Sequence, residues 1–269
     1  MLIVAKLGGS ILKDGTSSNL VEDVKELLKD HKLIFVHGGG SEVTEIALKL
    51  GKEQKFVVSP QGFRSRYTDK ETMEIFSMVM AGKMNKNIVL ALESQGIVAV
   101  GLSGLDGFLL KAKRKKRLVI IDDRGRKKVI DGGYTGKITE VNTALLKSLL
   151  EKNYTPVVTP IAISEEFEPL NVDGDRTAAA IACSLEADRL ILLTDVEGLI
   201  LNGKSVSKLK RSEIKPILSE IGQGMSTKIH ASYRALDEGI PEVIITSGSG
   251  KKPLSKALNH KRGTVISNE

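Results

Sequence analysis

The sequence contains no tryptophan and only one cysteine among its 269 residues. A lone cysteine cannot form an intrachain disulfide, so a disulfide-stabilised fold is excluded. Cys183 lies in the apolar segment 178–185 with no histidine near it, and we interpret it as a small buried side chain rather than a nucleophile. The chain also lacks a run of about 18 apolar residues, the length that a membrane-spanning helix needs. We therefore expect no membrane partner.

The first seven residues have the composition of a β-strand and carry no cleavable signal pattern. This start predicts a cytoplasmic protein. With 41% hydrophobic residues, the chain is rich enough in apolar side chains to bury a large core.

Basic residues outnumber acidic ones, which gives a net charge of +7 and a pI near 9.3. This excess favours an acidic partner, and nucleic acid, an acidic protein and anionic metabolites all satisfy it. Aromatic residues make up only 4% of the chain, and none interrupts the basic segment 111–117, where six of seven residues are positive. Base stacking needs such aromatics, so a nucleic-acid-binding protein is a distant alternative and we expect no nucleic-acid partner.

Short apolar segments alternate with amphipathic ones along the whole chain. The apolar segments predict strands at 1–7, 33–37, 98–102, 155–159, 189–194 and 242–246. The amphipathic segments predict helices at 19–29, 41–50, 70–95, 142–152, 176–186 and 225–238, with Ser41 as an N-cap. Continuously apolar strands between helices are typical of a parallel sheet covered on both faces. The predicted fold class is therefore α/β, a three-layer αβα sandwich.

Between residues 108 and 138 the alternation stops. Residues 118–122 and 128–130 predict a charged β-hairpin with its turn at Arg124 and Gly125.

Two glycine loops follow the first two predicted strands. Residues 6–10 read Lys-Leu-Gly-Gly-Ser, and residues 37–41 read His-Gly-Gly-Gly-Ser. Glycines at a strand end let the backbone approach an anion, and a helix N-terminus adds free N–H groups. Neither loop fits the P-loop or the dinucleotide fingerprint. A plain tight turn remains an alternative for the first loop, and we interpret His37 as a packed ring rather than an acid–base group.

Three motifs in the second half also suit phosphate chemistry. Residues 171–175 read Asn-Val-Asp-Gly-Asp before a helix, residues 194–198 read Thr-Asp-Val-Glu-Gly after a strand, and Lys228 lies in the first turn of a predicted helix. Each has an ordinary alternative, namely a helix cap, a strand exit and a solvated surface lysine.

Taken together and in this order, the motifs resemble the amino acid kinase family over essentially the whole chain. The length resembles the acetylglutamate kinase branch. The resemblance implies one domain, residues 1–269, in which residues 1–170 bind an acyl substrate and residues 171–269 bind ATP. It also implies at least a homodimer. Some relatives carry an additional N-terminal helix linked to inhibition by arginine, and we do not expect that inhibition here.

The resemblance also implies a role for each motif residue. Lys6 and Lys228 would stabilise the transferred phosphoryl group, and Asp175 would orient both lysines. The remaining implied contacts are with phosphate (Gly8 and Gly9), the acyl substrate (Gly39, Gly40, Arg64 and Asn171) and ATP (Thr194, Asp195 and Gly198). A carboxylate acceptor is already ionised at pH 7, so no general base is needed. Mg²⁺ would be held by ATP rather than by a protein metal site.

The substrate segment 62–69 reads Gly-Phe-Arg-Ser-Arg-Tyr-Thr-Asp. Together with residues 132–137, it resembles the branch that phosphorylates 2-aminoadipate or glutamate linked to an acidic amino-group carrier protein, on the way to lysine or arginine. In that branch the carrier's C-terminal glutamate blocks the substrate's amino group. Carrier docking is then expected at the following residues: Arg66, Tyr67, Lys113, Arg114 and Lys116.

Two alternatives stay open within the family. A conventional kinase of free N-acetylglutamate would use the same core motifs. Aminoadipate and glutamate differ by one methylene, worth only about 1 kcal/mol, so the sequence does not distinguish them.

Overall fold

A central eight-stranded sheet organises the computed structural model, which describes residues 1–13 and 15–268. Its strand order is β16 (Lys208–Lys210), β18 (Thr264–Ser267), β17 (Glu242–Ser247), β13 (Arg189–Thr194), β1 (Leu2–Leu7), β2 (Lys32–His37), β10 (Thr155–Thr159) and β5 (Ala99–Ser103). Neighbouring strands run parallel except β17 and β18, which are antiparallel. The prediction of a mainly parallel α/β sheet is confirmed.

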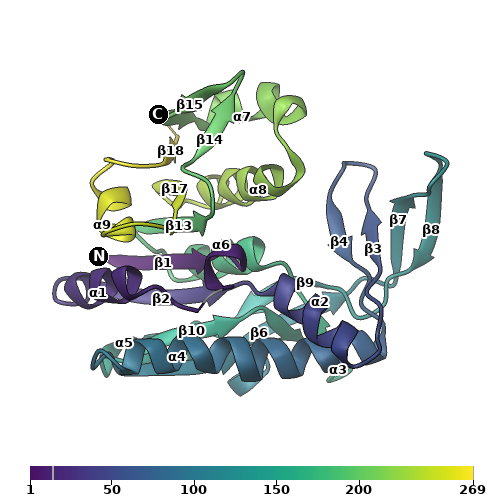
Figure 1. The fold of residues 1–269 in the computed structure, drawn as a ribbon, viewed down its shortest axis with the longest axis horizontal. Helices are drawn as coiled ribbons and strands as arrows, with labels where there is room; N and C mark the ends of the chain where they lie inside the picture. Colours follow the sequence, from purple (N-terminus) through teal and green to yellow (C-terminus); the bar gives the residue numbers. More distant parts are fainter. Residues whose placement is uncertain (14, 269) are drawn as a thin grey trace.

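Helices cover both faces of this sheet (Figure 1). One face carries α1 (Ser18–Leu27), α2 (Gly40–Lys49), α3 (Lys70–Ser77), α4 (Asn85–Glu93) and α9 (Pro253–Leu258), and the other α5 (Thr143–Glu151), α6 (Gly174–Ser184), α7 (Arg211–Ile217) and α8 (Gln223–Asp237). Alternate residues of β1 serve the two layers: Ile3 and Ala5 pack in one buried cluster and Val4 in the other. This is why the strands read as uninterrupted apolar runs.

The predicted helix at 70–95 is continuous but irregular. A π-helical segment, η2 (Met78–Met84), separates α3 from α4. The predicted N-cap at Ser41 is wrong, because α2 begins one residue earlier and Gly39 occupies the cap with φ 155°. A Cβ on Gly39 would lie 2.9 Å from Met80 Sδ, so packing against η2 requires glycine there.

Two hairpins stand side by side away from the main body (Figure 1). Strands β3 (Phe56–Val58) and β4 (Arg64–Arg66) form one, β7 (Arg117–Ile121) and β8 (Lys127–Asp131) the other, and β3 pairs with β7. The predicted charged hairpin is confirmed. The basic segment before it is divided, however, because residues 110–114 form a strand of a different sheet.

That second small sheet has the order β12 (Pro169–Asn171), β11 (Ile161–Ile163), β6 (Leu110–Arg114) and β9 (Gly136–Val141). The remaining short elements are the hairpin of β14 (Leu199–Leu201) and β15 (Lys204–Val206) and the 3₁₀ turns η1 (Ser10–Leu12), η3 (Asp106–Phe108) and η4 (Leu218–Glu220). Within the described ranges, no helix has the length and hydrophobicity to cross a membrane.

Candidate active site

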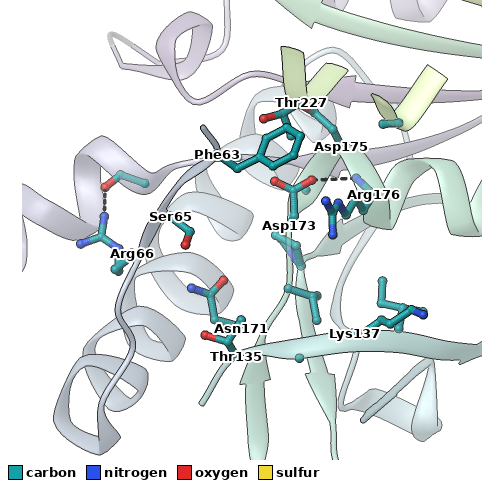
Figure 2. Close-up of a pocket in the computed structure, with 18 of the residues that line it drawn as sticks. Phe63, Ser65, Arg66, Thr135, Lys137, Asn171, Asp173, Asp175, Arg176 and Thr227 are labelled. Atoms are coloured by element: carbon teal, nitrogen blue, oxygen red, sulfur yellow. Dashed lines mark hydrogen bonds between the residues drawn. The ribbon is translucent and has the colours of Figure 1, made fainter. Parts of the chain in front are cut away.

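A cleft of about 640 Å³ opens at the carboxyl ends of β1, β2 and β10 (Figure 2). It is lined by the second glycine loop, the β3–β4 hairpin, the start of α6 and one side of α8. Open α/β sheets bind ligands at the carboxyl ends of their strands, because the loops that follow parallel strands lie together there.

Two lysines from opposite ends of the chain contact one buried carboxylate. Lys6 Nζ, on β1, lies 2.8 Å from Asp175 Oδ1, and Lys228 Nζ, on α8, lies 3.2 Å from Asp175 Oδ2. Asp175 lies in the first turn of α6 and is only 3% exposed. The sequence places these residues far apart, and the fold brings them into one cluster.

The ion pairs determine the charges of this cluster. Burial alone would raise the pKa of Asp175, but the ammonium groups of Lys6 and Lys228 outweigh it and lower that pKa. Burial also opposes the charge of Lys6, yet Asp175 raises the pKa of the Lys6 ammonium above its usual value. Lys6 therefore stays protonated and Asp175 ionised around neutral pH.

The two glycine loops touch each other through their backbones. A Cβ on Gly9 would lie 2.8 Å from Gly39 N, and a Cβ on Gly38 would lie 2.9 Å from Gly9 N. Gly8 is constrained on its other side, where a Cβ would lie 2.9 Å from Leu193 O. A side chain at Gly9 or Gly38 would force the two loops apart, and one at Gly8 would clash with β13, so these glycines serve close approach as well as turn geometry.

His37 is fully buried beside the second loop. Its ring lies 3.0 Å from Gly38 O through Nδ1 and 2.8 Å from Thr159 Oγ1 through Nε2. Burial lowers the pKa of His37 to about 4, so the imidazole is neutral. The interpretation of His37 as a packed ring is confirmed.

The predicted acyl-substrate residues lie on the cleft wall. Arg64 is exposed, and its guanidinium stacks 3.8 Å from the centroid of the Phe56 ring. Asn171 donates a hydrogen bond from Nδ2 to Thr68 Oγ1 at 3.0 Å. Both line the same cleft as Lys6 and Gly39.

Arg66 has a different environment from the one that a docking residue needs. Its side chain is 9% exposed and donates to Gly40 O at 2.6 Å and Thr44 Oγ1 at 2.9 Å. Burial and the nearby charge of Arg64 lower the pKa of Arg66 to about 10. These contacts hold the glycine loop against the hairpin and leave little of the side chain for a partner protein.

Arg114 is likewise committed within its own chain. It lies 2.7 Å from Glu168 Oε2, donates from Nε to Gly133 O, and packs 4.4 Å from the centroid of the Tyr134 ring. Lys113 and Lys116 are exposed, and Tyr67 is half-buried. Of the predicted docking residues, the two lysines are the most accessible.

The structure also brings in residues that sequence reasoning missed. Lys115, Lys137, Asp173 and Arg176 all line the cleft. Burial and the negative charge of Asp175 raise the pKa of Asp173. Arg176 directly follows Asp175, and Lys115 lies within the basic segment, but neither position signals its direction in space.

The cleft is bridged by an aromatic contact. Phe63, at the end of the β3–β4 hairpin, lies with its ring centroid 5.0 Å from that of His230 on α8, in an edge-to-face arrangement. Phe63, Thr227 and Asp173 all line the cleft (Figure 2). The contact joins the β3–β4 hairpin to α8, so this hairpin covers part of the cleft.

The predicted ATP residues are not among the residues that line the cleft. Thr194, at the end of β13, donates a 3.0 Å hydrogen bond to Asp195 Oδ1. Gly198 packs on β18, where its Cβ would lie 2.7 Å from Thr264 Oγ1. The same loop is tied to the loop after α9 by an ion pair between Glu197 and Arg262.

In the part of the chain that the structure describes, no group of three or more metal-ligating side chains occurs. Two of the three carboxylates on the cleft wall are paired with cations, Asp175 with the lysines and Glu238 with Arg234. Among the described residues, Asp173 forms no ion pair within 4.0 Å, and its Oδ1 accepts a 2.9 Å hydrogen bond from Arg176 N at the start of α6.

Comparison with known proteins agrees with this geometry. A sequence model described as the amino acid kinase family matches residues 1–247. A putative LysW-aminoadipate/LysW-glutamate kinase of Nitrosopumilus maritimus is 51% identical, and the alignment covers 100% of both chains. The LysW-aminoadipate/LysW-glutamate kinase of Sulfolobus acidocaldarius is 46% identical over 98% of this chain and 100% of its own.

Solved structures share the fold at lower identity. The protein smu.665 of Streptococcus mutans superposes with a TM-score of 0.82 at 24% identity, covering 100% of this chain and 99% of its own. An isopentenyl phosphate kinase gives a TM-score of 0.65 at 21% identity, covering 99% and 100%. The curated relatives are named as kinases, and the fold is shared with an isopentenyl phosphate kinase. The chain belongs to the amino acid kinase family.

Proposed function

We propose that the protein is an ATP-dependent kinase that phosphorylates the side-chain carboxylate of 2-aminoadipate, glutamate or both, while the substrate's amino group is linked to an acidic carrier protein. The product is an acyl phosphate for lysine or arginine biosynthesis. The names of relatives that are 46–51% identical over nearly the full length support this substrate class. ATP is a cytoplasmic metabolite, so we propose that the reaction takes place in the cytoplasm.

The convergence of Lys6 and Lys228 on Asp175, beside two touching glycine loops, is the observation that carries the proposal. Phosphoryl transfer passes through a loose transition state in which negative charge spreads over the transferred group. Two ammonium groups held by one carboxylate can turn toward that charge from two sides, while backbone N–H groups of the loops bind its oxygens. The acceptor carboxylate needs no base.

We assign the other residues by the chemistry of their positions. Arg64 and Asn171 bind the α-carboxylate and polar groups of the amino-acid substrate, and Asp175 orients the two lysines. The backbones of Gly8, Gly9, Gly39 and Gly40 contact phosphate and the reacting carboxylate. Arg66 positions the second glycine loop. Lys113, Lys116 and Tyr67, which directly follows β4, receive the carrier.

The two halves of the chain divide the ligands in this proposal. Residues 1–170 bind the acyl substrate, and residues 171–269 bind ATP through the loop at Thr194, Asp195 and Gly198. Mg²⁺ enters with ATP and is held mainly by its phosphates, since Asp173 is the one unpaired cleft carboxylate among the described residues. We also propose a homodimer. The edge strand β5 and exposed Leu90 and Val98 offer an apolar surface for it.

A phosphorylation assay tests the function directly. Purified protein is given ATP and Mg²⁺ with carrier-linked aminoadipate, carrier-linked glutamate or free N-acetylglutamate, and ADP release and acyl phosphate are measured. We expect kcat/KM to be highest for a carrier-linked substrate. Efficient turnover of N-acetylglutamate alone would identify a conventional acetylglutamate kinase, and turnover of none of the three would reject the proposal.

Reversing the charges of Lys113 and Lys116 to glutamate should raise KM for the carrier-linked substrate. Both side chains are exposed, so the change should remove long-range attraction to an acidic carrier without disturbing the core. The dependence of KM on salt should also flatten, while KM for ATP stays the same. Arg114 is left intact because its ion pair with Glu168 is internal.

Lys147→Glu is the matched control, since Lys147 is an exposed lysine on α5 outside the cleft. Lys147→Glu changes the net charge by as much as each of the two substitutions at Lys113 and Lys116. An unchanged KM in the double variant would show that the carrier docks elsewhere.

A further inference from the structure

A buried polar cluster lies behind the second glycine loop. It consists of His37 at the end of β2, Thr159 at the end of β10 and Asn85 at the start of α4, each at most 1% exposed. None of the three lines the cleft. Among the described residues, nothing hydrogen-bonds to the buried Oδ1 of Asn85, and an unpaired buried carbonyl costs stability. Stability alone therefore does not account for these polar side chains.

The hydrogen bonds from Asn85 set the direction of this cluster. Asn85 donates from Nδ2 to Val157 O at 2.9 Å and to Thr159 Oγ1 at 3.1 Å. These two bonds use both hydrogens of the amide, so the longer contact of 3.4 Å from Nδ2 to His37 Nε2 is secondary. Thr159 Oγ1 accepts from Asn85 and keeps its own hydrogen for His37 Nε2, which lies 2.8 Å away.

The ring of His37 continues in the same direction. Burial lowers the pKa of His37 to about 4, so the ring is neutral and carries one proton. Nδ1 lies 3.0 Å from Gly38 O, and a carbonyl oxygen only accepts, so Nδ1 carries that proton. Nε2 is then the acceptor that the hydroxyl of Thr159 requires. The chain of donors begins at Asn85 and ends on Gly38 O.

The last acceptor belongs to the peptide group that joins Gly38 to Gly39. The described chain contains no cis peptide bond, so the C=O and N–H of this peptide point in opposite directions. Fixing Gly38 O therefore also fixes the direction of the Gly39 N–H. A Cβ on Gly9 would lie 2.8 Å from Gly39 N, which places this N–H where the two loops meet. Among the described residues none accepts a hydrogen bond from it.

Glycines on both sides make this peptide easy to rotate. Gly39 has φ 155°, which a residue with a side chain rarely adopts, and neither glycine has a side chain that could hold the peptide plane. A rotated peptide would turn its carbonyl oxygen toward the reacting oxygens, so that repulsion would replace a hydrogen bond. The orientation has to be held from outside the loop.

We propose that Asn85, Thr159 and His37 form a positioning chain, which holds the Gly38–Gly39 peptide so that the Gly39 N–H faces the oxygens of the reacting groups. None of the three touches the substrate, and each acts through the next. These roles rest on the proposed function, to which they add three positioning residues. Hydrogen bonds in a chain polarise one another, so the chain also makes the Gly39 N–H a stronger donor.

The π-helical segment η2 supports the same loop. Asn85 directly follows η2, and Met80 O, within it, accepts a 3.5 Å hydrogen bond from Thr159 Oγ1. Met80 Sδ is also the atom that a Cβ on Gly39 would meet. π-Helical turns are rare and recur at functional sites. Here the irregular turn places Asn85 and Met80 against the cluster and the loop together.

Thr159→Val tests the chain, because valine has the shape of threonine and lacks only the hydroxyl. We expect kcat for the acyl substrate to fall by about tenfold or more, since the Gly39 N–H acts mainly in the transition state. KM for ATP and for the acyl substrate should change by less than about threefold. Thr159→Ser keeps the hydroxyl and should retain most of kcat.

Thr246→Val is the matched control. Thr246 is also fully buried at a strand position, but among the described residues its hydroxyl has no hydrogen-bond partner. Removing this hydroxyl should leave kcat unchanged.

The proton position on His37 gives a second readout that does not depend on turnover. NMR of protein with isotope-labelled histidine should show the Nδ1–H tautomer for this ring, and the signal is identified by its loss in His37→Asn. Asparagine keeps a donor near the position of Nδ1, so His37→Asn should retain more kcat than His37→Leu, which has none.

Wild-type kcat in a folded Thr159→Val variant would overturn the positioning chain even if Tm fell, because a purely structural cluster affects stability alone. An Nε2–H tautomer in the wild type would overturn it as well, since Gly38 O would then have no donor. If the wild type phosphorylates no acyl substrate, the proposed function is rejected instead, and the tautomer by itself decides whether the chain ends on Gly38 O.

Discussion

Replacing Lys6 or Lys228 by methionine should lower kcat by about 10²–10³-fold, the usual effect of removing one charged or hydrogen-bonding group that stabilises a transition state. Both ammonium groups are held on Asp175, at 2.8 and 3.2 Å, next to the loops that would bind the transferred group. Their charge matters most when negative charge spreads over the phosphoryl oxygens. KM for the acyl substrate should therefore change much less than kcat.

The fold should survive either single substitution. Methionine matches the aliphatic part of a lysine side chain, and Asp175 keeps one cation after the other is removed. Removing both lysines would leave a buried carboxylate unpaired, so the double variant should also lose thermal stability. The measurements are steady-state kinetics and Tm for both single variants and the double variant, with Lys147→Met as a control outside the cleft.

A folded Lys6→Met or Lys228→Met variant that keeps kcat within about tenfold of the wild type would contradict the assignment, because a transition-state charge interaction in a water-poor site is worth more than that. A loss confined to KM would place the lysine in ground-state binding only.

Gly9→Ala should reduce kcat/KM by about 10²-fold, since misplacing reacting groups by about 1 Å has an effect of that size. The added Cβ would meet Gly39 N at 2.8 Å and Gly39 Cα at 3.2 Å. Both are backbone atoms of the opposite loop, so no side-chain rotation relieves the clash. The two loops must separate, which moves the N–H groups away from the transferred phosphate. Some loss of Tm should accompany the loss of activity.

Gly82→Ala is the matched control. Gly82 lies in η2, is exposed, and a Cβ there would meet no atom within 4 Å. Alanine is favoured over glycine in helices by up to about 1 kcal/mol, so this variant should be at least as stable as the wild type and fully active. Normal kinetics in Gly9→Ala would show that the contact between the loops is not required for catalysis.

Much of the fold was predictable because its signals are local. Apolar strands such as residues 33–37 are buried on both faces, and that burial appears in the sequence as an uninterrupted hydrophobic run. Helix boundaries were less predictable. Ser41 is a good capping residue by type, but α2 starts at Gly40 because Gly39 must pass over Met80. Gly39 and Met80 are 41 residues apart in the sequence. Their contact determines where α2 begins, so no local sequence pattern indicates the N-cap.

The candidate site, like the fold, was only partly predictable from the sequence. The glycines and the two lysines stand in recognisable motifs. Arg66 was predicted to bind the carrier because of the resemblance of segment 62–69 to the carrier-dependent branch, and Arg114 because it lies in the basic segment 111–117. Their directions depend on strand register: Arg66 turns inward to Gly40, and Arg114 turns to Glu168. Lys115 and Lys137 went unnoticed for the opposite reason, since nothing in the sequence indicates that they face a cleft.

By itself, the sequence determined the αβα layering, the sites of the glycine loops and the identity of the charged groups, because hydrophobic period and turn chemistry act over a few neighbouring residues. The tertiary structure decided which charges meet. Lys6, Asp175 and Lys228 form one cluster only because β1, α6 and α8 pack together. The directions of Arg66 and Arg114 follow from the pairing of β3 with β4 and of β6 with β9.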